Sequence, residues 1–127
     1  MANLRTPLSV AKGRGSSGSG TEHFWHQRIT AVALVPLVIW FCFSVAALPA
    51  MDHASITAWL SAPFNAILMI AAIIAIFFHA SLGLQVVLED YVSQHGIRTI
   101  AIIVVKLLCF LLAITGVFSV IKIALGS

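Results

Sequence analysis

The chain has 127 residues, of which 61% are hydrophobic and 9% are charged, and its formal net charge is +3. Its apolar residues fall in runs that are too long for a soluble domain of this size, so a soluble fold is excluded. The small positive charge comes from cations that flank these runs, and it gives no indication of nucleic-acid binding.

Three apolar runs are each long enough to cross a membrane as an α-helix. They cover residues 29–48, 64–88 and 99–121. A helix rises about 1.5 Å per residue, so about 20 residues span hydrocarbon that is about 30 Å thick. The runs lack the alternation of a β-barrel, and an open sheet cannot satisfy its edge groups in lipid. The sequence therefore predicts an all-α integral membrane protein with three transmembrane helices.

The segments outside these runs have different characters. Residues 1–22 are polar and of low complexity, which predicts a flexible N-terminal tail, and residues 23–127 then form one membrane anchor domain. In the first loop, residues 54–62 are predicted to form a short helix on the membrane surface.

The distribution of cations predicts the topology. The loop of residues 49–63 contains no Lys or Arg, whereas cations precede the first run and flank the second loop: Arg5, Lys12, Arg14, Arg28 and Arg98. Because positive residues stay inside, we expect a cytoplasmic N-terminus and a periplasmic C-terminus.

His79 is the one ionisable residue inside the second run, about nine residues from its cytoplasmic end. An ionisable residue at such depth suggests a function. Helical steps of about 100° place Ala72, Ala75 and Gly83 on the same face as His79. A flat macrocycle could approach this face, with the histidine as an axial ligand of iron. Alternatively, small residues at this spacing serve close helix packing, and the imidazole bonds to a neighbouring helix.

The second run ends in Glu89, Asp90 and Tyr91. Two acids at a helix C-terminus oppose the helix dipole unless cations offset them, although they can simply form a solvated helix end. We expect Arg28 to reach the same membrane level from the first helix, as a partner of Asp90 or of a haem propionate. Tyr91 is the only tyrosine, and its phenol can donate a hydrogen bond to a carbonyl at the membrane boundary.

Two segments together resemble a known family. The sequence of residues 79–91, HASLGLQVVLEDY, is similar to the second-helix signature of the small, cytochrome b556-type membrane anchor subunit of succinate dehydrogenase, respiratory complex II. It has a histidine, a glycine four residues later, and Asp-Tyr eleven and twelve residues later. Residues 26–31, HQRITA, resemble the Arg-x-Thr-Ala start of that family's first helix.

The resemblance implies a function for each matching residue. The chain would form half of a heterodimeric anchor bundle, with His79 as one axial ligand of haem b and the second axial histidine in a larger cytochrome b anchor subunit. Arg28 would pair with a haem propionate or line the quinone pocket. Tyr91 would donate a hydrogen bond to ubiquinone, and Asp90 would support that site.

The resemblance also implies partners and a location. The chain would be a non-catalytic subunit, with no catalytic residue of its own, in an enzyme that passes electrons from succinate to ubiquinone. It has no cysteine set for an iron-sulfur cluster and no dinucleotide fingerprint, so those cofactors belong to an iron-sulfur subunit and a flavoprotein subunit. A bacterial inner membrane is expected rather than a mitochondrial one, because the tail is short and begins with methionine.

Two other functions stay open at this point. The chain could be a haem-free structural or assembly subunit in which His79 only packs against a neighbour. A small transporter would need a path of polar groups through the membrane, and in this sequence only His79 lies deep.

Overall fold

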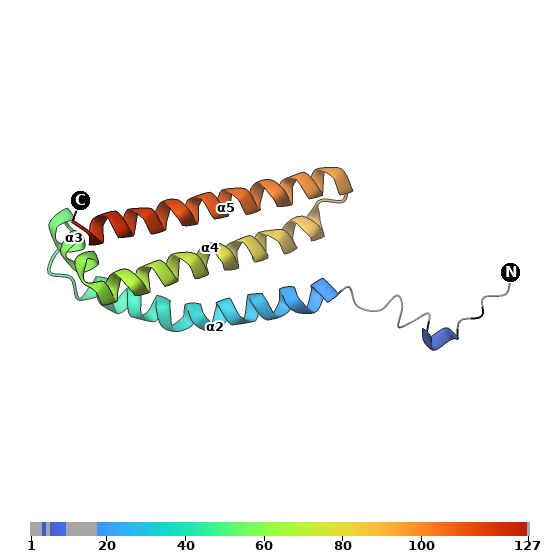
Figure 1. The fold of residues 1–127 in the computed structure, drawn as a ribbon, viewed down its shortest axis with the longest axis horizontal. Coiled ribbons are helices and arrows are strands. Elements are labelled where there is room, and N and C mark those ends of the chain that lie inside the picture. Colours follow the sequence, from blue (N-terminus) through green and yellow to red (C-terminus); the bar gives the residue numbers. More distant parts are fainter. Residues whose placement is uncertain (1–3, 5, 10–17, 127) are drawn as a thin grey trace.

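The computed structural model of the chain describes residues 4, 6–9 and 18–126, and this part is entirely helical apart from short connections. A helical turn at residues 7–9 precedes four longer helices, which are α2 (Gly18–Ala46), α3 (His53–Ser61), α4 (Pro63–Tyr91) and α5 (His95–Ala124) (Figure 1). The all-α fold class is confirmed. Of the predicted flexible tail, residues 1–3, 5 and 10–17 lie outside the described part, and residues 18–22 already belong to α2.

Three of the helices are long and apolar enough to cross a membrane. They cover Thr21–Ala46, Pro63–Tyr91 and His95–Ala124, with 26, 29 and 30 residues. These lengths correspond to about 39–45 Å, which exceeds the hydrocarbon thickness of about 30 Å. The helices extend beyond the apolar runs because polar residues at the membrane boundary keep their backbone hydrogen bonds by continuing the helix. The protein is a multi-pass membrane protein.

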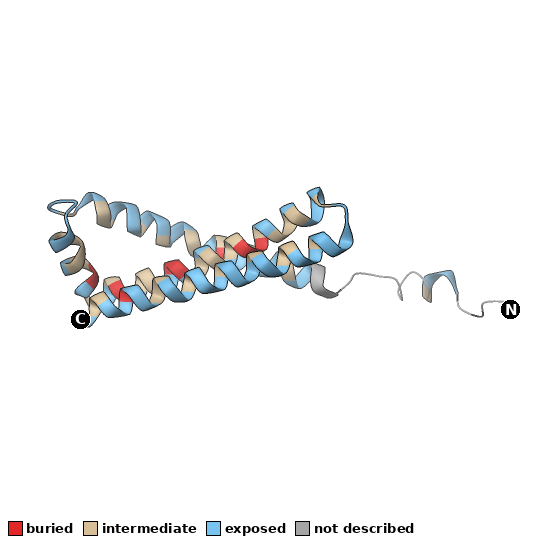
Figure 2. Cartoon of the chain, turned by 90° about the horizontal axis from the view of Figure 1, so that it is seen from above, coloured by how far each residue is buried: buried red, intermediate tan, exposed pale blue. Residues whose placement is uncertain are grey.

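The three long helices form a single layer with α4 in the middle (Figure 1). The α4 helix contacts both α2 and α5, whereas within the described residues α2 and α5 do not contact each other. Seen from above, α2 crosses α4 and then moves away from it toward α3 (Figure 2). The order of the layer means that α5 does not cover a site between α2 and α4.

The best packed region lies between α4 and α5, close to α3. Its buried residues are Leu60, Ala66, Ile73 and Val120. Gly116 allows α5 to approach closely, since a Cβ atom at this position would lie 3.1 Å from Cγ2 of Ile73. Most other large apolar side chains of the described residues are exposed, as Figure 2 shows for the outer faces of all three helices. Such faces need lipid or further helices to cover them.

The short helix predicted in the first loop is confirmed as α3. Asp52 caps its N-terminus by accepting a hydrogen bond from the backbone N–H of Ser55 at 2.9 Å. Hydrogen bonds from the Ser55 side chain and from its amide hold the pKa of the Asp52 carboxyl below its ordinary value. Trp59 of α3 stacks on Trp40 of α2 at a centroid distance of 5.4 Å, which connects the loop to the diverging end of α2.

Candidate cofactor site

The centre of the site is His79, which lies near the middle of α4 and is bonded to α2. Its Nδ1 atom is 2.9 Å from Oγ1 of Thr30. Thr30 is itself buried, with 9% of its surface exposed. This hydrogen bond joins α2 to α4, and it places Thr30 opposite His79 in the register of the two antiparallel helices.

The other ring nitrogen of His79, Nε2, has no hydrogen-bond partner among the described residues. It is also not among the enclosed polar atoms that lack a partner, which in this part of the chain are Nε2 of His23 and Oε1 of Gln85. The imidazole is therefore held on one side and accessible on the other. This is the arrangement that an external ligand or metal requires.

Arg28 lies in the same hollow as His79. The hollow has a volume of about 340 Å³ and is lined by Phe24, Gln27, Arg28, Ala31 and His79. The guanidinium of Arg28 lies over the ring of Phe24, 5.1 Å from its centroid, which is a cation–π contact. The structure thus brings together the two residues that were expected to hold a cofactor, a potential axial ligand and a cation.

The expected alternative, an ion pair between Arg28 and Asp90, is not present in the described part of the chain. No ion pair joins these two side chains in the described part of the chain, because the helix register separates them. The Thr30–His79 bond places Arg28 opposite approximately residue 81 of α4, which is about 15 Å from the Tyr91 end along the helix axis. Arg28 is exposed on α2 at a level about 15 Å from the end of α4.

Asp90 and Tyr91 are both exposed at the last turn of α4, and 84% of the Tyr91 surface is accessible. Glu89 differs from them, since its Oε1 accepts a hydrogen bond from Nε2 of Gln85 at 2.9 Å. Within this chain, neither Asp90 nor Tyr91 belongs to the hollow at His79, and the rise of the helix separates His79 from Asp90 by about 16 Å. The four expected site residues therefore form two groups, one deep and one at the helix end.

The small residues on the His79 face of α4 differ in how closely they pack against other helices. Ala72 is buried, with 5% of its surface exposed, so it serves close packing. A Cβ atom added at Gly83 would meet no atom within 4 Å, so Gly83 packs against nothing in this chain. The face next to His79 is thus open on the Gly83 side, whereas Ala72 on the same stripe serves close helix packing.

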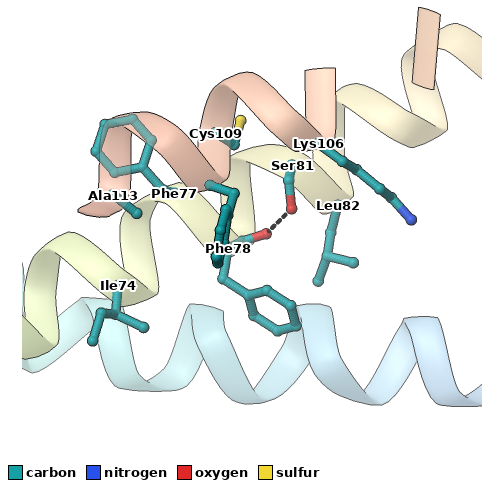
Figure 3. A pocket seen from close by; sticks show the side chains of 9 residues that line it. Ile74, Phe77, Phe78, Ser81, Leu82, Lys106, Cys109 and Ala113 are labelled. Atoms are coloured by element: carbon teal, nitrogen blue, oxygen red, sulfur yellow. Dashed lines mark hydrogen bonds between the residues drawn. The ribbon is translucent and has the colours of Figure 1, made fainter. Parts of the chain in front are cut away.

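A second hollow, of about 330 Å³, lies between α4 and α5 (Figure 3). It is lined mainly by apolar side chains, and its two polar members are Ser81 and Lys106. The Ser81 hydroxyl donates to the backbone carbonyl of Phe78 at 2.8 Å, and the ammonium of Lys106 extends away from the hollow (Figure 3). Cys109 also lines this space, and unlike the hollow at His79 the space contains no histidine.

Sequence reasoning did not single out Thr30 as a site residue. It appeared only as part of the Arg-x-Thr-Ala segment, and a threonine in an apolar helix has no pattern that marks it. The available signal was its position two residues after Arg28, which places it in the same turn. Its contact with His79 depends on how α2 packs against α4, which a single sequence does not reveal.

Comparisons with known proteins agree with this architecture. Residues 2–115 match the family model of the succinate dehydrogenase/fumarate reductase transmembrane subunit. A succinate dehydrogenase hydrophobic membrane anchor subunit from Rickettsia bellii (strain RML369-C) is 38% identical over 118 residues, which cover 93% of this chain and 94% of that protein. The subunit of the same name from Paracoccus denitrificans is 30% identical over 122 residues, covering 96% of this chain and 94% of that protein. With three membrane-spanning helices and this extent of similarity, the chain belongs to the succinate dehydrogenase/fumarate reductase transmembrane subunit family, as a membrane anchor subunit of succinate dehydrogenase.

Proposed function

We propose that this subunit supplies His79 as one of the two protein ligands of a haem b and forms part of a ubiquinone reduction site with Tyr91 and Asp90. The observation that carries the proposal is the imidazole of His79, whose Nδ1 is bonded to Thr30 while Nε2 is left without a partner in the described chain. When bound, haem b would supply a one-electron redox centre to the complex.

The residues around His79 fit such a group. A single axial histidine is one half of a bis-histidine site, and the described residues contain no cluster of three or more His, Cys, Asp or Glu that would form a complete metal site. The second ligand then comes from the larger cytochrome b anchor subunit. The open face at Gly83 gives a flat macrocycle room beside the helix.

Arg28 would pair with a haem propionate. An arginine at membrane depth is costly unless it has an anionic partner, and in the described part of the chain Arg28 is exposed and contacts the uncharged ring of Phe24. A carboxylate that belongs to the cofactor would satisfy this charge. Its position in the hollow of His79 supports this function over a function at the end of α4.

Tyr91 and Asp90 would form the quinone part of the site together with the partner subunits. Both side chains are exposed at the end of α4, beside the boundary where a quinone head group enters from the membrane. The Tyr91 phenol would donate a hydrogen bond to a quinone carbonyl, and the Asp90 carboxylate would orient the phenol or accept a proton nearby. The iron-sulfur subunit and the flavoprotein subunit would cover this end of the bundle from the cytoplasm. The bacterial inner membrane would be the location.

The ligand function is tested by His79→Ala in the purified complex. The variant should lose the b-type band in the reduced-minus-oxidised spectrum, because no other described group replaces the nitrogen at this position. His53→Ala is the matched control, since His53 is exposed at the start of α3 and should leave the band intact. An unaltered band in His79→Ala would show that the chain is a haem-free anchor, which is the alternative function.

The quinone function is tested by Tyr91→Phe, which removes only the hydroxyl. Losing one hydrogen bond of about 0.5–1.5 kcal/mol should lower kcat/KM for quinone reduction by about 2- to 12-fold. Succinate oxidation with a soluble dye acceptor should stay at the wild-type rate, because that reaction bypasses the membrane subunits. Equal losses in both assays would argue against a quinone site at this residue.

A further inference from the structure

The hydroxyl of Thr30 is shared by three groups. Its Oγ1 lies 2.9 Å from the backbone carbonyl of His26, 3.0 Å from the carbonyl of Gln27 and 2.9 Å from Nδ1 of His79. Thr30 and Ser81 are the two buried polar residues of the described chain, each 9% exposed, and only Thr30 touches a titratable ring. The hydroxyl therefore joins the backbone of α2 to the imidazole of α4.

Counting protons determines the direction of each bond. A hydroxyl has one hydrogen to donate and lone pairs to accept, and a backbone carbonyl can only accept. If the hydrogen points to the carbonyls of His26 and Gln27, as threonine commonly does in helices, the oxygen accepts from an N–H at His79. If it points to His79 instead, two oxygen–oxygen contacts of 2.9 and 3.0 Å have no hydrogen between them. The first arrangement satisfies all three contacts.

This arrangement assigns the tautomer of His79. We infer that Thr30 is a positioning residue that keeps the proton of the neutral imidazole on Nδ1, so that the Nε2 lone pair is free to bind iron. The inference rests on the proposed function of His79 as a haem ligand and extends it to a residue of α2. It also explains why one ring nitrogen is bonded inside the bundle and the other is left without a partner in the described chain.

The bond has a second consequence for the geometry of the ligand. An imidazole bonded through Nδ1 cannot rotate about its side-chain torsions without breaking that bond, so the plane of the ring is fixed relative to α2. Partners of this kind typically raise metal affinity by about 10- to 100-fold, because they orient the ligand and increase its basicity. Thr30 thus couples the packing of α2 against α4 to the strength of the axial bond.

The test is Thr30→Val in the purified complex, because valine keeps the shape of the side chain and removes the hydroxyl. Haem affinity, measured by transfer to an apo-haem acceptor protein, should fall by about 10- to 100-fold. The electron paramagnetic resonance signal of the ferric haem should shift as the ring reorients, and the midpoint potential should rise as the ligand becomes less basic. Thr30→Ser should restore wild-type values, because it keeps the hydroxyl. If serine behaves like valine, the hydroxyl by itself does not sustain haem binding, and the inference is wrong.

A measurement without haem keeps the two proposals separate. Nitrogen-15 spectra of the full chain in bilayers, labelled at the histidine rings, report which ring nitrogen carries the proton, and His79→Ala identifies the relevant signals. Wild type and Thr30→Ser should show protonated Nδ1 at His79, and Thr30→Val should show a mixture of tautomers. Ser81→Ala is the matched control, since its hydroxyl is equally buried and bonds only to its own helix. A tautomer that is the same in Thr30→Val and wild type would overturn the inference, whereas haem retained in His79→Ala would overturn only the proposed ligand.

Discussion

The open face beside His79 makes Gly83 the most informative position for a perturbation. Gly83 lies one helical turn from His79 toward Tyr91, and a Cβ atom there would meet nothing within 4 Å in this chain. Gly83→Ala should therefore leave the chain itself at least as stable, since alanine improves the helix propensity by about 1 kcal/mol. Gly83→Leu places a large side chain on the face where the macrocycle is proposed to lie.

The expected loss of haem follows from the cost of overpacking. Adding a side chain to occupied space typically costs about 1–3 kcal/mol, and about 1.4 kcal/mol corresponds to a factor of ten. Haem affinity in Gly83→Leu should thus fall by about 5- to 140-fold. The assay is haem per purified complex, followed by transfer of haem to an apo-acceptor, and chain stability is measured separately by denaturation in detergent.

A matched control separates cofactor binding from general effects of the substitution. Gly96, in the first turn of α5, also has no atom within 4 Å of an added Cβ, and it is far from His79. Gly96→Leu should leave haem affinity unchanged. The reasoning is refuted if Gly83→Leu binds haem as tightly as wild type, or if it reduces assembly of the complex while the assembled fraction keeps full haem affinity. The second result would mean that a partner helix covers this face.

Two further predictions concern packing and the loop. Gly116→Ala places a Cβ atom 3.1 Å from Cγ2 and 3.3 Å from Cδ1 of Ile73, so overpacking of about 1–3 kcal/mol should outweigh a propensity gain of about 1 kcal/mol. Denaturation in detergent should show a net loss of up to about 2 kcal/mol, which disappears in an Ile73→Ala background. For Asp52, the folded pKa is lowered, so its stabilisation of α3 is fully present above the ordinary carboxyl pKa and is lost as the pH falls through the lowered value. A carboxyl titration by nuclear magnetic resonance should show this lowered pKa, and Ser55→Ala should move it back toward the ordinary value.

The sequence by itself determined the membrane class and the number of spans. Hydrocarbon of fixed thickness requires about 20 apolar residues per helix. Each span can therefore be recognised from its own residues, without knowledge of tertiary contacts, so three runs predict three helices. The depth of His79 and the position of Asp90 and Tyr91 at a helix end follow from counting residues along one helix. The helix ends were less well determined, because polar segments such as residues 21–28 continue the helix beyond the apolar run.

Only the tertiary structure decided which residues meet between helices. The expectation that Arg28 lies level with Asp90 failed, because the bond between Thr30 and His79 places Arg28 about 15 Å deeper than the end of α4. The same contact revealed Thr30 as a part of the site and left Gly83 open. Helix register in a membrane is set by the fit of side chains on two separate segments. Because lipid-facing and helix-facing positions are equally apolar, the hydrophobic pattern of the sequence does not reveal which residues face the neighbouring helix. For this reason the sequence located the histidine, and the packing of α2 against α4 decided which of its nitrogens is free.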